Sequence, residues 1–430
     1  MNLTPTPSRL PFWANLQLLS LTFILIGVGG GVTSTDSGMS VPDWPGTGGE
    51  FMLFAPFKFW VHDLGRILEH SHRLIGMAVG LAAIAVAFIN WKHAGERRWL
   101  RWLGLTLLAG VILQGLLGGF RVSDHSRLLA AFHGVFGQVL FALMTFGTLA
   151  WSRAWPGSTA VLPAGLLARV GQKVLVVVPV AVVGASLAYA GKRAAPAAEG
   201  QMQWHMEKFL PLFLMALAAV MACGGLTLAA GLKAWKGQTF TPQTRSLRTH
   251  AWLMLGFLAL QLCLGAAVRH LPAEHAIQTL TMAPAMSQAK INAQNDKLAE
   301  QAKTDPEAKK QYDRVALDMK MDAAGNPFLP AGKVHLHYTH RLIGYLTGLV
   351  SIGWLAVLNK RKALAPVPLA PKAALGAAVA LQIALGMFTV LSGVHAVYAT
   401  SHQTGGALLL AATVWLSVHC CLASKEKGTA

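Results

Sequence analysis

The chain has 430 residues, of which 54% are apolar and only 13% charged, so its composition indicates an integral membrane protein and excludes an ordinary soluble domain. Its net charge of +18 would suit a nucleic-acid-binding protein, but the basic residues lie mainly in short loops on alternate sides of the apolar stretches. This is the positive-inside pattern of membrane proteins, and we therefore expect no nucleic-acid partner.

Apolar stretches of about 20 residues are long enough to cross a bilayer as helices. We predict ten of them, near residues 15–33, 70–90, 101–121, 129–151, 172–190, 209–232, 250–269, 338–358, 373–393 and 400–422. No strand pattern of alternating polarity is present, so the predicted fold class is an all-α integral membrane protein. The loop charges place both termini in the cytoplasm and the loops 34–69 and 270–337 outside, as in a multi-pass protein of the bacterial inner membrane.

A duplicated motif stands at the start of two of these stretches. The five residues from His72 to Gly76, His-Arg-Leu-Ile-Gly, recur 268 residues later from His340. Each copy is followed at 42 residues by a glutamine and at 61 or 62 residues by a second histidine; these are Gln114 and Gln382, then His133 and His402. The spacing predicts an internal repeat with two histidines in each copy.

The repeat divides the chain into two pseudo-repeated four-helix halves. The N-terminal half is predicted to span residues 1–152 and the C-terminal half residues 246–430, with its long external loop at 270–337. Residues 153–245 have no counterpart in the repeat and are predicted to form an inserted transmembrane hairpin. The polar segment 286–325 is expected to be an exposed helix or a partly disordered loop.

The four repeat histidines are expected to lie in the first turn of their helices, at one depth near the outer face. A glycine follows each by four residues, on the same helix face; these are Gly76, Gly137, Gly344 and Gly406. The missing side chains would leave room for a flat group such as a porphyrin. Because paired imidazoles on facing helices can bind a haem iron axially, we predict one site between His72 and His133 and one between His340 and His402. Zinc or copper, with further histidines nearby, is the alternative.

The two copies differ three residues before the motif histidine. Glu69 stands there in the first copy and His337 in the second. An ionisable residue beside a membrane site is a functional candidate, so the half with Glu69 is expected to perform chemistry and the other half to pass electrons. Arg73 and Arg341 are expected either to pair with haem propionates or to reach lipid head groups.

These residues resemble the haem A synthases of bacteria and mitochondria. The resemblance covers residues 15–152 and 250–422 and includes Glu69-x-x-His72-Arg73, His133, His340-Arg341, His402-Gln403, three Gln-x-x-Leu-Gly runs and the loop from Ser37 to Pro45. It implies that His340, His402 and Arg341 bind haem b, and that His72, His133 and Arg73 bind the substrate, haem O. It also implies that Glu69 is catalytic.

The implied reaction oxidises the C8 methyl group of haem O to a formyl group by successive hydroxylation, giving haem A. A haem O synthase and an electron-donor protein are the implied partners, for cytochrome oxidase assembly, and the oligomeric state is open. This chain departs from the resemblance at Val41 and Thr47, where many bacterial relatives carry a cysteine pair. Two other readings stay open, a non-catalytic b-type cytochrome or haem carrier and a transporter.

Overall fold

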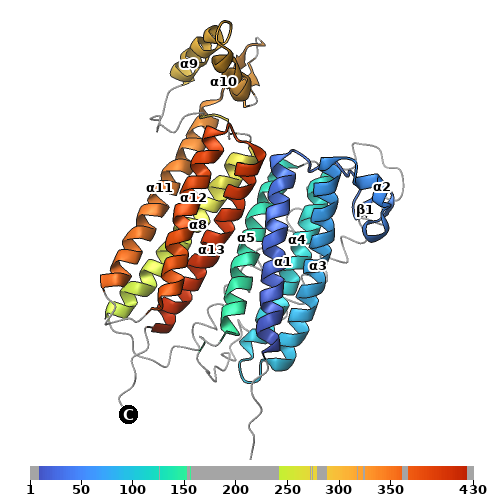
Figure 1. The fold of residues 1–430 in the computed structure, drawn as a ribbon, viewed down its shortest axis with the longest axis vertical. Coiled ribbons are helices and arrows are strands. Elements are labelled where there is room, and N and C mark those ends of the chain that lie inside the picture. Colours follow the sequence, from blue (N-terminus) through green and yellow to red (C-terminus); the bar gives the residue numbers. More distant parts are fainter. Residues whose placement is uncertain are drawn as a thin grey trace, which may run out of the picture.

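The computed structural model describes residues 9–124, 126–152, 155, 242–271, 273, 275–277, 288–316, 318–322, 325–360 and 367–423. These residues include eight helices that are long and apolar enough to span a membrane (Figure 1). The prediction of an all-α membrane protein is confirmed. The two spans predicted near 172–190 and 209–232, and the inserted hairpin that they would form, lie outside the described residues.

The first four spanning helices form one four-helix unit. They are α1 (Leu10–Ser34), α3 (Leu64–His93), α4 (Trp99–Asp124) and α5 (Arg127–Ala150). Each contacts its neighbours in this order, and α5 returns to α1, so α3 and α5 face each other across the unit. A row of fully buried leucines on α4 fills the centre; they are Leu100, Leu103, Leu107, Leu113 and Leu117.

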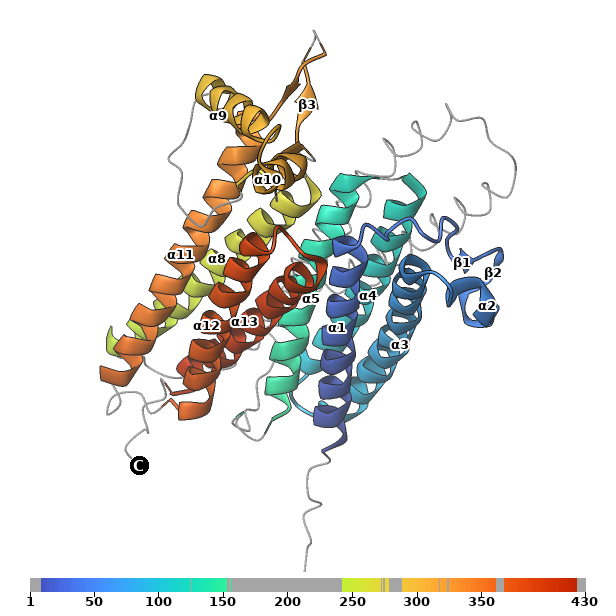
Figure 2. The ribbon, with the colours of Figure 1, turned by 45° about the horizontal axis from the view of Figure 1, so that its top comes forward.

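The last four spanning helices repeat this arrangement. They are α8 (Pro242–His270), α11 (Ala331–Lys360), α12 (Leu369–Leu391) and α13 (Ala396–Ala423). Again each helix contacts the next, and α13 returns to α8. The two units lie side by side (Figures 1 and 2), with α13 against α1 and α5, and α8 against α5. The helix order is therefore the same in both units.

The long connection of each unit lies at the same end of the molecule (Figure 1). In the first unit it contains strands β1 (Gly46–Thr47) and β2 (Glu50–Phe51), the short 3-10 helix Met52–Phe54, and α2 (Phe57–Trp60). In the second it contains α9 (Gln288–Gln301), α10 (Pro306–Ala316), and strands β3 (Lys320–Met321) and β4 (Pro327–Phe328). Both strand pairs are antiparallel.

The connection of the second unit has a small apolar core of its own. Its buried members are Ile277, Ile291, Val315, Leu329 and Val334. Because these side chains come from the loop, from α9 and α10, and from the first turn of α11, they hold the loop helices at the start of α11. The polar segment 286–325 is therefore largely helical in its described part.

The prediction that the histidines lie in the first helical turn is wrong. Helix α3 begins eight residues before His72 and α5 six residues before His133, while α11 and α13 begin nine and six residues before His340 and His402. Side-chain caps allow the polar residues ahead of the apolar runs to be helical: Asp63 accepts a hydrogen bond from Arg66 N at 3.1 Å, and Ser126 accepts one from Leu129 N at 3.2 Å. The histidines therefore lie within the bundles.

Candidate functional site

Both predicted histidine pairs meet inside their four-helix units. The imidazole of His72 on α3 faces that of His133 on α5, with ring centroids 6.3 Å apart and planes at 66°. The imidazole of His340 on α11 faces that of His402 on α13, with centroids 6.4 Å apart and planes at 89°. Each pair joins the second and fourth helices of its unit, so the repeat produces two equivalent sites.

The distance within each pair matches two imidazoles bound to one metal ion. A metal–imidazole bond is about 2.0 Å long and the ring centroid lies about 1.1 Å beyond the nitrogen, so opposite ligands of one ion have centroids about 6.2 Å apart. The observed 6.3 and 6.4 Å agree with this value. Among the described residues no group of three or more His, Cys, Asp or Glu side chains is placed to hold a metal ion, so the protein offers two ligands in each site.

A glycine of the neighbouring helix lies against each of the four imidazoles. A Cβ atom built at these glycines would approach the imidazole Cε1 to between 2.9 and 3.1 Å; the pairs are Gly29 with His72, Gly118 with His133, Gly265 with His340, and Gly386 with His402. Any side chain there would push the ring away. The four glycines stand on α1, α4, α8 and α12, at equivalent places in the repeat.

Three of the imidazoles lie against the backbone of the neighbouring helix. His72 interacts with the backbone at Leu25, His133 with that at Gln114 and His402 with that at Gln382. A metal-binding imidazole usually directs its other ring nitrogen at such a backbone group, which fixes its tautomer and orientation. The spacing, the glycine contacts and these backbone partners fit a haem iron between each pair.

Glutamines on the neighbouring helices contact three of the histidines or the backbone beside them. Gln114 Nε2 donates to the His133 carbonyl at 2.9 Å, and Gln261 Nε2 lies 3.2 Å from His340 Nδ1. The amide groups of Gln114, Gln261 and Gln382 also lie beside Gly137, Gly344 and Gly406. These glycines were expected to make room for a porphyrin, and instead they make room for an amide.

The site of His72 lacks this glutamine. In the other three sites the glutamine stands four residues before the glycine that contacts the imidazole. On α1 the residue four before Gly29 is Leu25. Gly76 accordingly has open space where the other three glycines contact an amide. His72 is therefore the one repeat histidine held without a neighbouring amide, which makes the first unit chemically different from the second.

The second unit contains a cavity of about 290 Å³ at its histidine pair. Both His340 and His402 line it, together with Arg269, His270 and Arg341. Gly134 of α5 also lines it, so this cavity reaches the first unit directly beside His133. The cavity at the second histidine pair is thus lined in part by the helix that carries His133 of the first pair.

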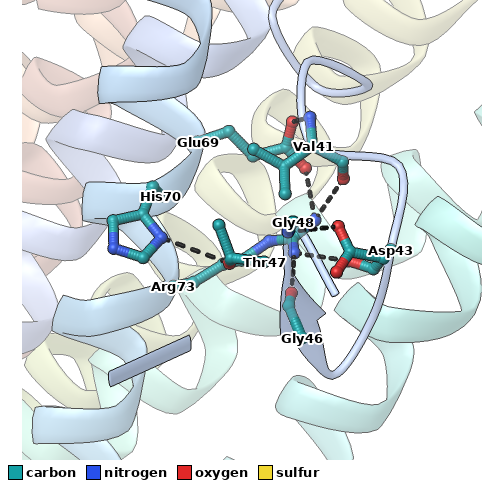
Figure 3. A network of polar contacts seen from close by, with 8 residues as sticks. All are labelled: Val41, Asp43, Gly46, Thr47, Gly48, Glu69, His70 and Arg73. Carbon is teal, nitrogen blue, oxygen red and sulfur yellow. Dashed lines mark hydrogen bonds and ion pairs between the residues drawn. The ribbon is translucent and has the colours of Figure 1, made fainter. Parts of the chain in front are cut away.

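Glu69 is buried and engaged with the connection that follows α1 (Figure 3). Its Oε2 accepts a hydrogen bond from Val41 N at 2.9 Å, and its Oε1 pairs with Arg73 Nη2 at 2.8 Å. Arg73 donates in addition to the carbonyl oxygens of Val41, Asp43 and Gly46. Glu69 and Arg73 together dock the loop onto α3.

Further hydrogen bonds hold the same loop near Val41 and Thr47, the two positions at which many bacterial relatives carry cysteines. Thr47 Oγ1 lies 3.2 Å from Nδ1 of the buried His70, and Asp43 accepts from the backbone of Gly48 and Gly49 at 3.0 Å (Figure 3). Val41 and Thr47 are both completely buried. Val41 and Thr47, which stand where the relatives carry cysteines, are thus held in place by hydrogen bonds to Glu69 and His70 of α3.

The second unit docks its loop with the corresponding residues. Arg341 Nη2 donates to the Ile277 carbonyl at 2.7 Å, and His337 Nδ1 lies 2.8 Å from the Ala273 carbonyl. His337 stands at the place of Glu69, and Arg341 at that of Arg73. In both units, therefore, the residues three before and one after the histidine bind the backbone of the preceding connection.

Removing the Arg73 guanidinium is expected to release the loop from α3. Its side chain is only 8% exposed and that of Glu69 5%, so an Arg73→Gln substitution leaves a buried carboxylate without its cation. Such losses cost about 3–5 kcal/mol. We expect faster hydrogen exchange at Val41 and easier proteolysis after Phe51.

Arg66→Gln is the matched control for this experiment. The Arg66–Asp63 pair is 4.0 Å long and its side chains are 43% and 57% exposed. Arg66 also donates to the Phe59 carbonyl at 3.2 Å, at the far end of the same connection. Exposed pairs contribute about 0–1 kcal/mol, so Val41 should stay protected. Equal protection of the loop in the Arg73 and Arg66 variants would contradict the docking role of Arg73.

Eight apolar helices that enclose two pairs of facing imidazoles define a multi-pass membrane protein built from two similar four-helix units. The sequence model of the COX15-CtaA family, described as cytochrome oxidase assembly protein, matches residues 12–210 and 205–414. The chain therefore belongs to this family.

Curated relatives of the chain carry names that describe an activity. It is 33% identical over 136 residues to the heme A synthase of Bacillus licheniformis, 35% identical over 118 residues to heme A synthase COX15 of Mus musculus, and 30% identical over 172 residues to the heme A synthase of Hyphomonas neptunium. These matches cover 31%, 22% and 32% of this chain, and 42%, 29% and 47% of the relatives. The aligned part is thus less than half of each relative.

The sequence interpretation missed the glycines that contact the imidazoles and one arginine, Arg121 of α4. Three of the glycines end the Gln-x-x-Leu-Gly runs, so the signal was present in the repeat. It could not be interpreted from sequence because the glycine and its histidine stand on different helices. Arg121 has no counterpart in the other copy and gave no repeat signal.

Proposed function

We propose that the chain is a haem A synthase that oxidises the C8 methyl group of haem O to a formyl group. The observation that carries the proposal is the presence of two imidazole pairs, each at the separation of opposite ligands on one iron. In this proposal His72 and His133 hold haem O, and His340 and His402 hold haem b. Family membership and the names of the relatives support the same activity.

Haem b in the second unit would supply one-electron transfer. The protein orients the bound haems and places charged side chains beside them. His72 and His133 fix the plane of the substrate, and the docked loop after α1 covers its outer edge. Gly134, the neighbour of His133, lines the second cavity, and this contact supports electron transfer from the second unit to the first.

Glu69 is proposed to serve the substrate half by holding a negative charge at the edge of the site. There it would accept a proton or stabilise positive charge that develops on the substrate during oxidation. Arg73 pairs with this carboxylate and keeps it oriented. Arg73 and Arg341 are thus proposed to act on the haem sites through the loops that they dock.

The proposed setting is a bacterial inner membrane with both termini in the cytoplasm and the haem sites near the outer face. A haem O synthase is the proposed source of substrate, and an electron-donor protein the proposed source of reducing equivalents. The grouping of the repeat histidines at the loop end of the helices, where the two long connections lie, supports this orientation.

The proposal is tested by expressing the full chain in a host that makes haem O but no haem A, and identifying the extracted haems by mass. We expect haem A or its hydroxylated precursor from the wild-type chain. The Glu69→Gln variant should bind both haems, but its rate of forming oxidised haem should fall by about 100-fold or more. Glu50→Gln is the control, because Glu50 is an exposed acid of the same connection.

Three outcomes would contradict parts of this account. An unchanged rate in Glu69→Gln with normal haem content would exclude the role of Glu69. Wild-type protein that carries haem b and haem O but forms no oxidised haem, with an electron donor present, would instead identify a haem carrier or b-type cytochrome. A colourless protein without a Soret band would point to a transporter.

A further inference from the structure

Arg121 is a partly buried cation near the histidine pair of the first unit. It stands three residues after Gly118, the glycine that contacts His133, and therefore on the same face of α4 about one turn closer to the loops. Arg121 thus lies between the iron-binding pair and the end of the bundle.

The Arg121 guanidinium makes no hydrogen bond and no ion pair with any residue that the structure describes. Glu69 is the carboxylate that attracts Arg121 most strongly, but its two oxygens are already used by Arg73 and Val41. Asp36 also attracts Arg121 from a distance, but it lies exposed on the loop after α1. Because a buried cation is costly without a partner, this arginine has the character of a ligand-binding group.

The loop after α1 is shaped to accommodate this guanidinium. A Cβ atom at Gly38 would overlap Nη2 of Arg121, so only glycine permits the observed position. Trp44 of the same loop lies directly on Gly119 of α4, where a Cβ would overlap its indole ring. The loop therefore lies directly against the guanidinium of Arg121.

We propose that Arg121 binds a carboxylate side chain of the tetrapyrrole held between His72 and His133. A guanidinium matches a carboxylate by two parallel hydrogen bonds. Propionates extend from the edge of a tetrapyrrole, and Arg121 stands about one turn from the level of Gly118 toward the loops. The inference rests on the proposed function, because it assumes a tetrapyrrole in the first unit. It also replaces the expectation that Arg73 fills this role, since Arg73 is occupied by the loop carbonyls.

The test compares two probes, haem b and its propionate dimethyl ester. Both are titrated into the purified full chain carrying His340→Ala, so that binding at the first unit is observed through the Soret shift. We expect this protein to bind the free acid about 10-fold to 100-fold more tightly than the ester. Adding Arg121→Gln should remove the preference, and Arg121→Lys should keep part of it.

Arg127→Gln is the matched control, because Arg127 is an exposed arginine at the start of α5. It should keep the full preference for the free acid. Gly38→Ala gives a second route to the same result, since it displaces the guanidinium without removing a charge, and it decides the question if Arg121→Gln does not fold. It should reduce the preference as well.

The inference is overturned if Arg121→Gln, or Gly38→Ala in its place, binds the free acid and the ester with the wild-type ratio. Failure of the proposed function looks different. In that case the His340→Ala protein would bind neither probe with a low-spin bis-histidine spectrum, and the site itself would be absent.

Discussion

Replacing His340 by alanine is expected to halve the haem content of the purified chain and to leave the remaining haem in the first unit. His340 and His402 face each other with ring centroids 6.4 Å apart, so loss of one imidazole removes one of two axial ligands. His72→Ala should do the converse and leave haem b in the second unit. The haem-to-protein ratio and the mass of the extracted haem distinguish the two results.

His335→Ala is the control for the His340 variant, since His335 is exposed on the same helix. It should leave the haem content unchanged. The assignment of the two sites would be contradicted if the His72 and His340 variants retained the same haem in the same amount.

Filling the glycine contact at His340 is expected to displace haem from the second unit without touching a ligand. A Cβ at Gly265 would already lie 3.1 Å from His340 Cε1, and the branched side chain of Gly265→Val would force the ring to move. Overpacking of this kind costs about 1–3 kcal/mol, which corresponds to about 5-fold to 150-fold weaker binding. Haem retention during purification and the midpoint of haem titration measure the effect.

Gly256→Val provides a control on the same helix, because Gly256 is exposed and has open space around it. That variant should retain both haems. If Gly265→Val also retained both with unchanged affinity, the glycine contact would have no part in holding the imidazole for a metal.

Much of this fold could be predicted from hydrophobic length and the repeat. Eight of the ten predicted spans are described helices, and the histidine register alone paired His72 with His133 and His340 with His402. The helix starts could not be predicted in the same way. Caps such as Asp63 and Ser126 extend helices into polar sequence, where hydropathy gives no signal.

The hydrogen-bond partners of individual side chains could not be predicted from the sequence. Arg73 has the residue type and position expected of a propionate ligand, but its hydrogen bonds go to carbonyls of a loop about 30 residues earlier in the chain. Arg121 gave no signal because only the folded loop shows that Gly38 lies against it. In both cases the contact joins segments whose relative position depends on the tertiary fold.

The measurement that tests the central claim most directly is the stoichiometry and axial ligation of iron in the purified full chain. Haem is counted per chain, and near-infrared magnetic circular dichroism identifies the axial ligands. The account predicts two haems per chain, both low-spin with two imidazole ligands, and loss of one in each of the His72→Ala and His340→Ala variants. A chain that binds no haem, or iron with other axial ligands in both sites, would contradict it.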